Sequence, residues 1–319
     1  MIEVRGLTKS YGPHKAVDHI SFSVKKGEVV GFLGPNGAGK TTTMRIITGF
    51  MPPSSGSASV AGFDVFEHPL EVKRRIGYLP ETPPLYGEMI VEDYLRFVAR
   101  LKLVEKTRIS ALVERAIEKT QLGDVRKRLI QNLSKGYRQR VGISQALVSD
   151  PEVLILDEPT VGLDPRQVAE VRALISELKG QHTIILSTHI LPEVQATCER
   201  IIILNRGKIV AEDSLEGLGR RASQSQAASR VFVRVGRTSE ALMAELHKIG
   251  GVRAVQLKDS DRYEIDTNGS KEVAPSVAGV VVTSGVGLLE LREEAFNLED
   301  VFLKLTTSEE SQVIEGALS

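Results

Sequence analysis

A glycine-rich octapeptide near the start of the chain constrains the fold more than any other segment. This octapeptide, Gly34-Pro35-Asn36-Gly37-Ala38-Gly39-Lys40-Thr41, follows the apolar run 29–33 and precedes a stretch with helical spacing. A short apolar run ahead of a glycine-rich turn predicts a buried strand, and the spacing after the turn predicts a helix. The chain must therefore build a strand–loop–helix unit whose turn is mostly bare backbone, because glycine carries no Cβ.

The octapeptide fits the phosphate-binding loop pattern at every required position. Its glycines let backbone N–H groups approach phosphate oxygens, and the following helix points its positive N-terminus at the same anion. Lys40 would supply a charge for the outer phosphates, and Thr41 a hydroxyl for Mg²⁺. The alternative, a glycine-rich turn with an incidental lysine, leaves the flanking strand and helix patterns unexplained. The predicted nucleotide-binding residues are Gly34, Pro35, Asn36, Gly37, Ala38, Gly39, Lys40, Thr41 and Thr42.

A second motif places two acids at the end of an apolar run. The run 153–156 is followed directly by Asp157 and Glu158. Open α/β sheets bind ligands at the carboxyl ends of their strands, so both acids would face a nucleotide. Asp157 would bind Mg²⁺, and Glu158 would orient or deprotonate the attacking water. Alone, such a run is as often a strand with a solvated end; together with a phosphate loop it indicates hydrolysis.

The region around these motifs alternates strand and helix patterns, as an α/β domain does. Short apolar runs predict strands buried on both faces, and they occur at 29–33, 153–156, 183–186 and 201–204. Helical spacing falls between them at 91–101, 109–119 and 166–178. Asp164 is a plausible N-cap for the last of these helices, with Pro165 at its first position.

A shift in composition predicts a second domain. Residues 219–229 are rich in Arg, Ser, Gln and Ala and hold no large apolar anchor, which is typical of a linker. Beyond them we expect a small α+β domain over residues 230–319, following a first domain over 1–218. Its predicted strands are 231–235, 254–257, 262–265 and 287–291, and its predicted helices are 239–249 and 297–305.

Charge and hydropathy exclude some classes of protein. Lys plus Arg equals Asp plus Glu at 41 each, so the chain has no overall basic field for nucleic acid. No stretch approaches the roughly 20 apolar residues that span a bilayer. The start of the chain alternates polar and apolar residues, unlike a signal peptide. Any membrane role is therefore expected to come through another protein.

The chain holds a single cysteine, Cys198, which excludes an internal disulfide and fits a reducing compartment. It lies just before the apolar run 201–204. We interpret it as a small core residue rather than a redox centre.

Between the two motifs, Leu133-Ser134-Lys135-Gly136-Tyr137 resembles the signature of ABC ATPases, whose usual core is Leu-Ser-Gly-Gly-Gln. Further likenesses follow in the family's order. Tyr11 is similar to the aromatic residue that stacks on adenine, and segment 76–81 to the loop that normally ends in glutamine, here Glu81. Segment 162–164, ending in Asp164, resembles the loop that crosses between two nucleotide sites. His189 resembles the switch histidine.

The resemblance covers residues 1 to about 215 and implies a P-loop ABC ATPase domain with a helical subdomain. It implies ATP and Mg²⁺ as ligands, with Glu158 and His189 as catalytic residues. It adds Tyr11, Ser134 and Gly136 to the ATP-binding residues. The metal would be held by Thr41, Glu81 and Asp157, and Asp164 would lie in the dimer-crossing loop. Segment 298–302 resembles the C-terminal extension of type-two ABC exporter ATPases, most of all the gliding-motility and copper-maturation group.

The resemblance also implies partners. An ABC nucleotide lies between the phosphate loop of one copy and the signature of another, and this chain has one of each. We therefore expect a homodimer, or a dimer with a related ATPase, beneath a polytopic membrane permease. The chain would be cytoplasmic, peripheral on the inner face of the membrane, and would power export. No nucleic acid is expected.

Three departures from the family pattern leave alternatives open. Lys135 would add charge toward phosphate or be solvated, and Tyr137 would alter nucleotide affinity or helix packing. Glu81 would face Mg²⁺ and the γ-phosphate or be a surface acid on the loop toward the permease. Segment 79–100 would contact the permease or pack on its own helical subdomain.

Two other functions are weighed against transport. One is a soluble ABC ATPase of DNA repair or translation, but neither a long coiled-coil insert nor a second ATPase unit is present. The other is a nucleotide-dependent regulatory module without turnover, against which Glu158 and His189 argue.

Overall fold

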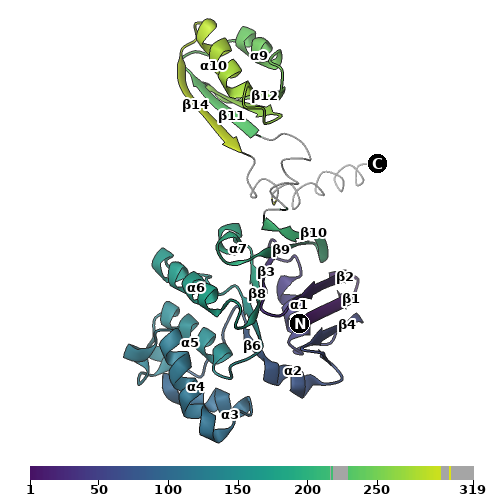
Figure 1. Ribbon diagram of the computed structural model, residues 1–319, viewed down its shortest axis with the longest axis vertical. Coiled ribbons are helices and arrows are strands. Elements are labelled where there is room, and N and C mark those ends of the chain that lie inside the picture. The colour runs from purple at the N-terminus through teal and green to yellow at the C-terminus, as the bar shows by residue number, and fades with distance from the viewer. Residues whose placement is uncertain (216, 218–228, 296–301, 303–319) are drawn as a thin grey trace. The chain divides into compact units, whose positions relative to one another are not determined.

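The structure is a computed structural model that describes residues 1–215, 217, 229–295 and 302 (Figure 1). The chain divides into two compact units, Met1–Glu212 and Asp213–Ser319, called here the first and second units. Within the described residues, no helix combines the length and the apolar character needed to cross a membrane.

The first unit is built on a six-stranded sheet in the order β10-β9-β3-β8-β7-β6. β3 pairs in parallel with β8 and β9, and β7 pairs in parallel with β6 and β8. Every residue of β3, β7 and β8 is buried, which explains their unbroken apolar runs. All four predicted strands of this region are confirmed. The strands are β3 (Val29–Leu33), β6 (Ile76–Leu79), β7 (Val153–Asp157), β8 (Thr183–Thr188), β9 (Arg200–Asn205) and β10 (Lys208–Ser214).

A second, antiparallel sheet in the order β2-β1-β4-β5 shares a core with the first. Its strands are β1 (Ile2–Tyr11), β2 (His14–Val24), β4 (Ser55–Val60) and β5 (Phe63–Asp64). Met44 and Ile46 of α1 (Lys40–Ile47) pack in one cluster with residues of β1, β2 and β3. This core holds the helix behind the glycine-rich loop. The short helix α2 (Pro69–Arg75) precedes β6.

A helical subdomain occupies the other side of the parallel sheet (Figure 1). It contains α3 (Val91–Leu101), α4 (Lys106–Lys119) and α5 (Lys135–Leu147), joined by the 3₁₀ turns η1 (Gly123–Val125) and η2 (Ile130–Asn132). Its own hydrophobic cluster includes Leu95, Val113 and Val141.

Two helices return to the parallel sheet, α6 (Pro165–Leu178) and α7 (Leu191–Thr197). Asp164 caps α6, because its Oδ1 accepts a hydrogen bond from the Gln167 backbone N–H at 3.0 Å. The predicted helix start, with Pro165 in the first position, is thus confirmed.

The second unit has the order strand–helix–strand–strand–helix–strand. Its elements are β11 (Ser229–Val235), α9 (Glu240–His247), β12 (Val252–Asp259), β13 (Arg262–Thr267), α10 (Val273–Thr283) and β14 (Leu288–Ala295). The antiparallel sheet runs β12-β13-β11-β14, the ferredoxin-like arrangement. Alternate residues of β11 face the helices, so Val231 and Val233 pack with Leu242 of α9 and Val277 of α10.

The predicted strands of the second unit and its first helix are present, whereas α10 was not predicted. Its run of valines suits a strand as well as a helix by composition, and burial against the sheet decides in favour of the helix. The predicted linker 219–229 lies outside the described residues except at Ser229, which opens β11. The predicted helix 297–305, apart from residue 302, also lies outside them. The predicted boundaries of the domains stay a prediction.

Cys198 follows α7 and is buried, with 6% of its surface exposed. Burial raises the pKa of its thiol to about 12, so the reactive thiolate is strongly disfavoured. The interpretation of Cys198 as a core residue is confirmed.

Candidate active site

The glycine-rich loop joins β3 to α1, and its backbone lies close to the backbone of two other segments of the protein. Gly39, the N-cap of α1, has φ +103°, and a Cβ there would lie 2.4 Å from the carbonyl oxygen of Ala16. A Cβ on Gly34 would lie 2.4 Å from the carbonyl oxygen of Leu204. Only glycine fits both positions, so the sequence of the loop is dictated by its path.

Lys40 is held over this loop. Its Nζ donates hydrogen bonds to the carbonyl oxygens of Gly34 at 2.8 Å and Pro35 at 3.2 Å. It also lies 3.6 Å from Oε1 of Glu158. Burial lowers the pKa of Lys40, and the nearby carboxylates of Glu158 and Asp157 act in the opposite direction. The cation is thus fixed between the loop and the end of β7.

Asp157 is the last residue of β7 and is fully buried. Its Oδ1 accepts a hydrogen bond from Ser187 Oγ at 2.7 Å, while Oδ2 has no hydrogen-bond partner among the described residues. Burial raises the pKa of Asp157, and the hydroxyls of Ser187 and Thr41 act against that shift. A buried carboxylate oxygen without a partner, close to a threonine hydroxyl, fits a Mg²⁺ ligand.

Within the described part of the chain, no group of three or more His, Cys, Asp or Glu side chains is placed to hold a metal by itself. Mg²⁺ in nucleotide sites usually takes one or two protein oxygens and completes its shell with phosphates and water. Asp157 and Thr41 therefore suit a metal that is bound jointly with a nucleotide.

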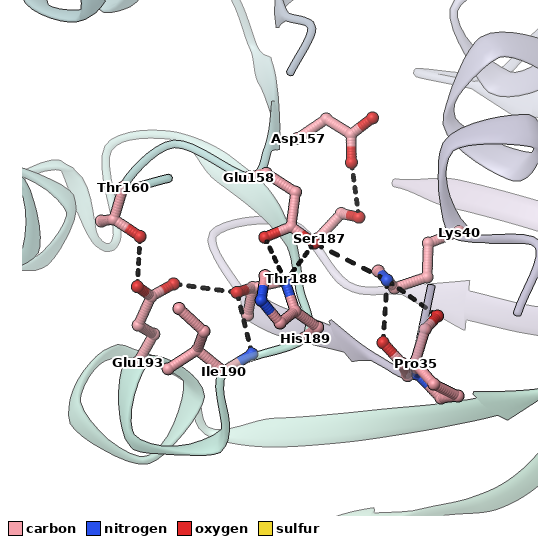
Figure 2. Close-up of polar contacts among 11 residues, drawn as sticks. Pro35, Lys40, Asp157, Glu158, Thr160, Ser187, Thr188, His189, Ile190 and Glu193 are labelled. Carbon is pink, nitrogen blue, oxygen red and sulfur yellow. Dashed lines mark hydrogen bonds and ion pairs between the residues drawn. The ribbon is translucent and has the colours of Figure 1, made fainter. Parts of the chain in front are cut away.

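Glu158 begins the turn after β7 in an unusual conformation. Its φ is +50°, in the left-handed region that residues other than glycine seldom adopt. Its backbone N–H donates to the Ser187 carbonyl at 2.8 Å, and both carboxylate oxygens lie 3.0 Å from His189 Nδ1. Figure 2 shows the carboxylate between His189 and Lys40. The turn therefore aims one acid at two basic groups that come from other elements.

A cavity of about 560 Å³ opens over these groups. Of the predicted site residues, it is lined by Tyr11, Asn36, Gly37, Ala38, Gly39, Lys40, Thr41, Thr42, Glu81, Glu158 and His189. Glu81 is exposed and faces this cavity, and its charge favours the protonated form of Lys40. The Tyr11 ring is half exposed at the rim, with its hydroxyl 3.4 Å from Met51 Sδ.

Several residues of this site carry no signal in the sequence. His14, Ala16 and Val161 line the cavity, and Ser187 holds Asp157. None of them has a side chain that the phosphate-loop pattern requires. They could have been found only by knowing that β2, β8 and the turn after β7 lie beside the loop.

Six predicted residues do not line the cavity. Gly34, Pro35 and Asp157 adjoin lining residues or contact Lys40, whereas Ser134, Gly136 and Asp164 belong to other segments. Ser134, the N-cap of α5, accepts a hydrogen bond from the Tyr137 backbone N–H at 3.4 Å. A Cβ on Gly136 would lie 2.4 Å from Gln167 Oε1, so this glycine packs against α6. Neither residue lines the cavity, nor does Asp164. The chain thus carries the predicted ATP-binding residues in two separate groups.

The departures from the family signature have packing partners. Lys135 is exposed, and its Nζ lies 1.8 Å from the position of a Cβ on Gly162, so the lysine occupies the space beside that glycine. Tyr137 packs on the cluster of the helical subdomain, and the Arg140 guanidinium lies 5.6 Å from its ring centroid. Helix packing is thus the role of Tyr137 that the contacts support.

The segment predicted to face a permease is divided between two environments. Leu85 and Met89 pack on the helical subdomain. Tyr86 is 55% exposed, with its ring centroid 6.0 Å from that of Tyr94 and 5.6 Å from that of Phe97. Packing on the helical subdomain is thus observed for these residues, while contact with a permease stays a prediction.

The strand–loop–helix cradle and the acids at the end of β7 place the first unit in the class of P-loop nucleoside triphosphatases. The family described as ABC transporter matches residues 17–161. The bacitracin transport ATP-binding protein BcrA of Bacillus licheniformis is 34% identical, over 96% of this chain and 97% of its own length. The daunorubicin resistance ATP-binding protein DrrA3 of Streptomyces coeruleorubidus is 33% identical, over 97% of this chain and 93% of its own length.

Among solved structures, one of the ATP-binding subunit of an ABC transporter matches with a TM-score of 0.65 and 32% identity, over 69% of this chain and 92% of that one. The chain belongs to the ABC transporter family and is an ATP-binding subunit with ATPase activity. The finer likeness to the gliding-motility and copper-maturation ATPases stays a prediction.

Proposed function

We propose that two copies of this subunit, or one copy and a related ATPase, hydrolyse ATP at shared sites and thereby power export through a separate permease. The observation that carries this proposal is the division of the ATP-binding residues. The cavity gathers the phosphate loop, Glu158 and His189, while Ser134 and Gly136 lie outside it. Signature residues that do not line the cavity of their own chain are available to the nucleotide of another chain.

In this proposal each residue around the cavity has a role that its position supports. Backbone N–H groups of the glycine-rich loop and the Lys40 ammonium bind the phosphates. Thr41, Asp157 and Glu81 would hold Mg²⁺, which would supply positive charge at the phosphates. Tyr11 at the rim stacks on the base.

Glu158 accepts the proton of the attacking water, and His189 keeps its carboxylate in place. For this contact His189 carries its proton on Nδ1 and donates it to the carboxylate, 3.0 Å away. Lys40 Nζ lies 3.6 Å from the same carboxylate, so two basic side chains orient the proposed base.

ATP then acts as a ligand that shifts a conformational equilibrium. Its γ-phosphate contacts Ser134 and Gly136 of the second copy only when the dimer is closed, and Asp164 lies in the loop that crosses between the sites. Hydrolysis removes that contact, so the open dimer is favoured again. Opening and closing would move the permease, and the subunit would lie on the cytoplasmic face of the membrane.

The direction of transport is supported by relatives that align over both units. These include the bacitracin transport and daunorubicin resistance proteins and the linearmycin resistance protein LnrL of Bacillus subtilis, 30% identical over 96% of this chain. We infer that this subunit serves an exporter of a toxic compound. The permease would line the path and select the compound.

Phosphate release in the steady state tests the site. Glu158→Gln and His189→Ala should each lower turnover by about 10² or more, the usual worth of a positioned base. Glu152→Gln is the matched control, because Glu152 is an exposed glutamate at the opposite end of β7. Turnover of Glu158→Gln equal to that of the control would remove Glu158 from the proposed chemistry.

A further inference from the structure

Glu193 of α7 is a buried acid that the proposed chemistry does not use. Only 2% of its surface is exposed. Its Oε1 accepts a hydrogen bond from Thr160 Oγ1, and its Oε2 accepts one from Thr188 Oγ1 at 2.9 Å. Figure 2 shows this carboxylate between the two threonines. Each oxygen is thus bound to a different segment of the chain.

The two segments are those that carry Glu158 and His189. Thr160 lies two residues after Glu158, and Thr188 lies immediately before His189. Both threonines are buried, with 4% and 0% of their surfaces exposed. One carboxylate therefore links the turn after β7 to the end of β8. These are the two segments whose Glu158 and His189 side chains contact each other.

Further hydrogen bonds make this tie rigid. Thr188 Oγ1 also accepts from the Ile190 backbone N–H at 3.1 Å, which fixes the turn that follows His189. The Glu193 backbone N–H donates to the Ile190 carbonyl at 3.1 Å, and its carbonyl accepts from Thr197 Oγ1 at 2.8 Å. Hydrogen bonds thus hold the backbone of Glu193 as well as the turn that its carboxylate contacts through Thr188.

A carboxylate suits this pair of threonines, because it offers one acceptor oxygen to each hydroxyl. Within the described residues, no lysine, arginine or histidine forms an ion pair with Glu193, so the two hydroxyls are its side-chain partners. Burying a charge is costly unless it is hydrogen-bonded, and an apolar residue would fill the same space at less cost. The retained carboxylate therefore serves geometry more than packing.

We propose that Glu193 is a positioning residue for ATP hydrolysis. It sets the distance between Glu158 and His189 by holding Thr160 and Thr188, and it touches neither of the two itself. The inference rests on the roles proposed above for Glu158 and His189. Small displacements of catalytic groups have large effects on rate. We therefore expect the loss of Glu193 to lower kcat while leaving ATP affinity nearly unchanged.

The test measures kcat, ATP affinity and thermal unfolding for four variants of the full chain. Glu193→Ala removes both acceptors and should lower kcat about tenfold or more, with the Kd for ATP changed less than about threefold. Glu193→Gln keeps one acceptor oxygen and should recover part of the loss. Thr160→Val and Thr188→Val each remove one hydroxyl at nearly constant shape and should lower kcat by smaller factors. The matched control is Glu199→Ala, an exposed acid near the same helix.

A double-variant cycle separates positioning from general stability. If Glu193 acts through His189, adding Glu193→Ala to His189→Ala should lower kcat much less than it does in the wild type. Equal losses in both backgrounds would contradict the proposal, as would a kcat of Glu193→Ala within twofold of the control. If Glu193→Ala does not fold, wild-type kcat in both threonine variants is the contradicting result. Full turnover in Glu158→Gln and His189→Ala would instead refute the proposed roles of those two residues.

Discussion

The two units of the chain both set helices against a sheet, but they use polar residues in different ways. In the first unit β3, β7 and β8 are buried throughout. Apart from Thr183 at the start of β8, their polar residues, Asp157, Ser187 and Thr188, lie where the parallel strands end. In the second unit alternate residues of β11 are buried, and Arg230, which precedes the first of them, pairs with Glu264 and Asp266 across the sheet.

This difference explains why the candidate active site lies in the first unit. Parallel strands bring all their carboxyl ends to one edge, so a few polar groups from distant segments converge there. An antiparallel sheet with one covered face spreads its polar groups over the other face, where neighbouring charges pair with one another. The first unit therefore concentrates charge on a ligand site, while the charges of β11 and β13 largely satisfy themselves.

The largest expected effect follows from removing the cation of the first unit. Lys40→Ala should lower turnover by about 10² or more, because a preorganised charge at the phosphates is lost. Steady-state phosphate release measures this. Lys15→Ala is the control, since Lys15 is exposed and pairs with Asp18. Equal turnover in both variants would mean that the cavity over the glycine-rich loop is not the site of hydrolysis.

A smaller effect is expected at Glu81. At 4 Å two unit charges interact by roughly 4 kcal/mol at an effective dielectric of 20, and solvent screens an exposed carboxylate well below that. Repulsion from phosphate and attraction to Mg²⁺ oppose each other. Glu81→Gln should therefore keep hydrolysis and tighten metal-free ATP binding by about two- to fivefold.

ATP affinity measured in EDTA and in saturating Mg²⁺ checks this expectation. Glu88→Gln is the matched control, as Glu88 is exposed on the same segment and does not line the cavity. An unchanged metal-free affinity in Glu81→Gln would place Glu81 away from the phosphates. It would then be a surface acid on the segment toward the permease.

The smallest effect on nucleotide binding is expected from removing the second unit. β11 pairs only with β13 and β14 among the described strands, so a chain ending at residue 218 leaves both sheets of the first unit intact. ATP affinity, followed by titration calorimetry, should stay within about twofold, well under the 1.4 kcal/mol of a tenfold change. Dimerisation or coupling to the permease should change instead. A truncated chain that folds but does not bind ATP would contradict the claim that the first unit alone forms the nucleotide site.

Sequence patterns located the chemistry of the first unit because its elements carry unambiguous signals. The apolar run 29–33 became β3 with the same bounds, and helical spacing at 91–101 became α3. A glycine-rich turn between a strand and a helix has few physical alternatives, so the position of Lys40 followed from local sequence alone.

What the sequence did not reveal depends on contacts between distant segments. The valines of α10 suit a strand or a helix, and only packing on the sheet of the second unit decides between them. Glu193 has no motif, since its role arises from Thr160 and Thr188, which lie 33 and 5 residues away. Lys135 could be interpreted either as a phosphate ligand or as a solvated side chain, and its place beside Gly162 came only from the fold.

The central claim, that one chain carries two halves of different sites, is tested most directly by the mass of Glu158→Gln in solution. Light scattering after size exclusion should give about 34.8 kDa without nucleotide. With Mg-ATP the mass should double, because binding survives while the step that reopens the dimer is blocked. A monomer that binds ATP at protein concentrations far above the Kd would contradict closure between two copies of this chain.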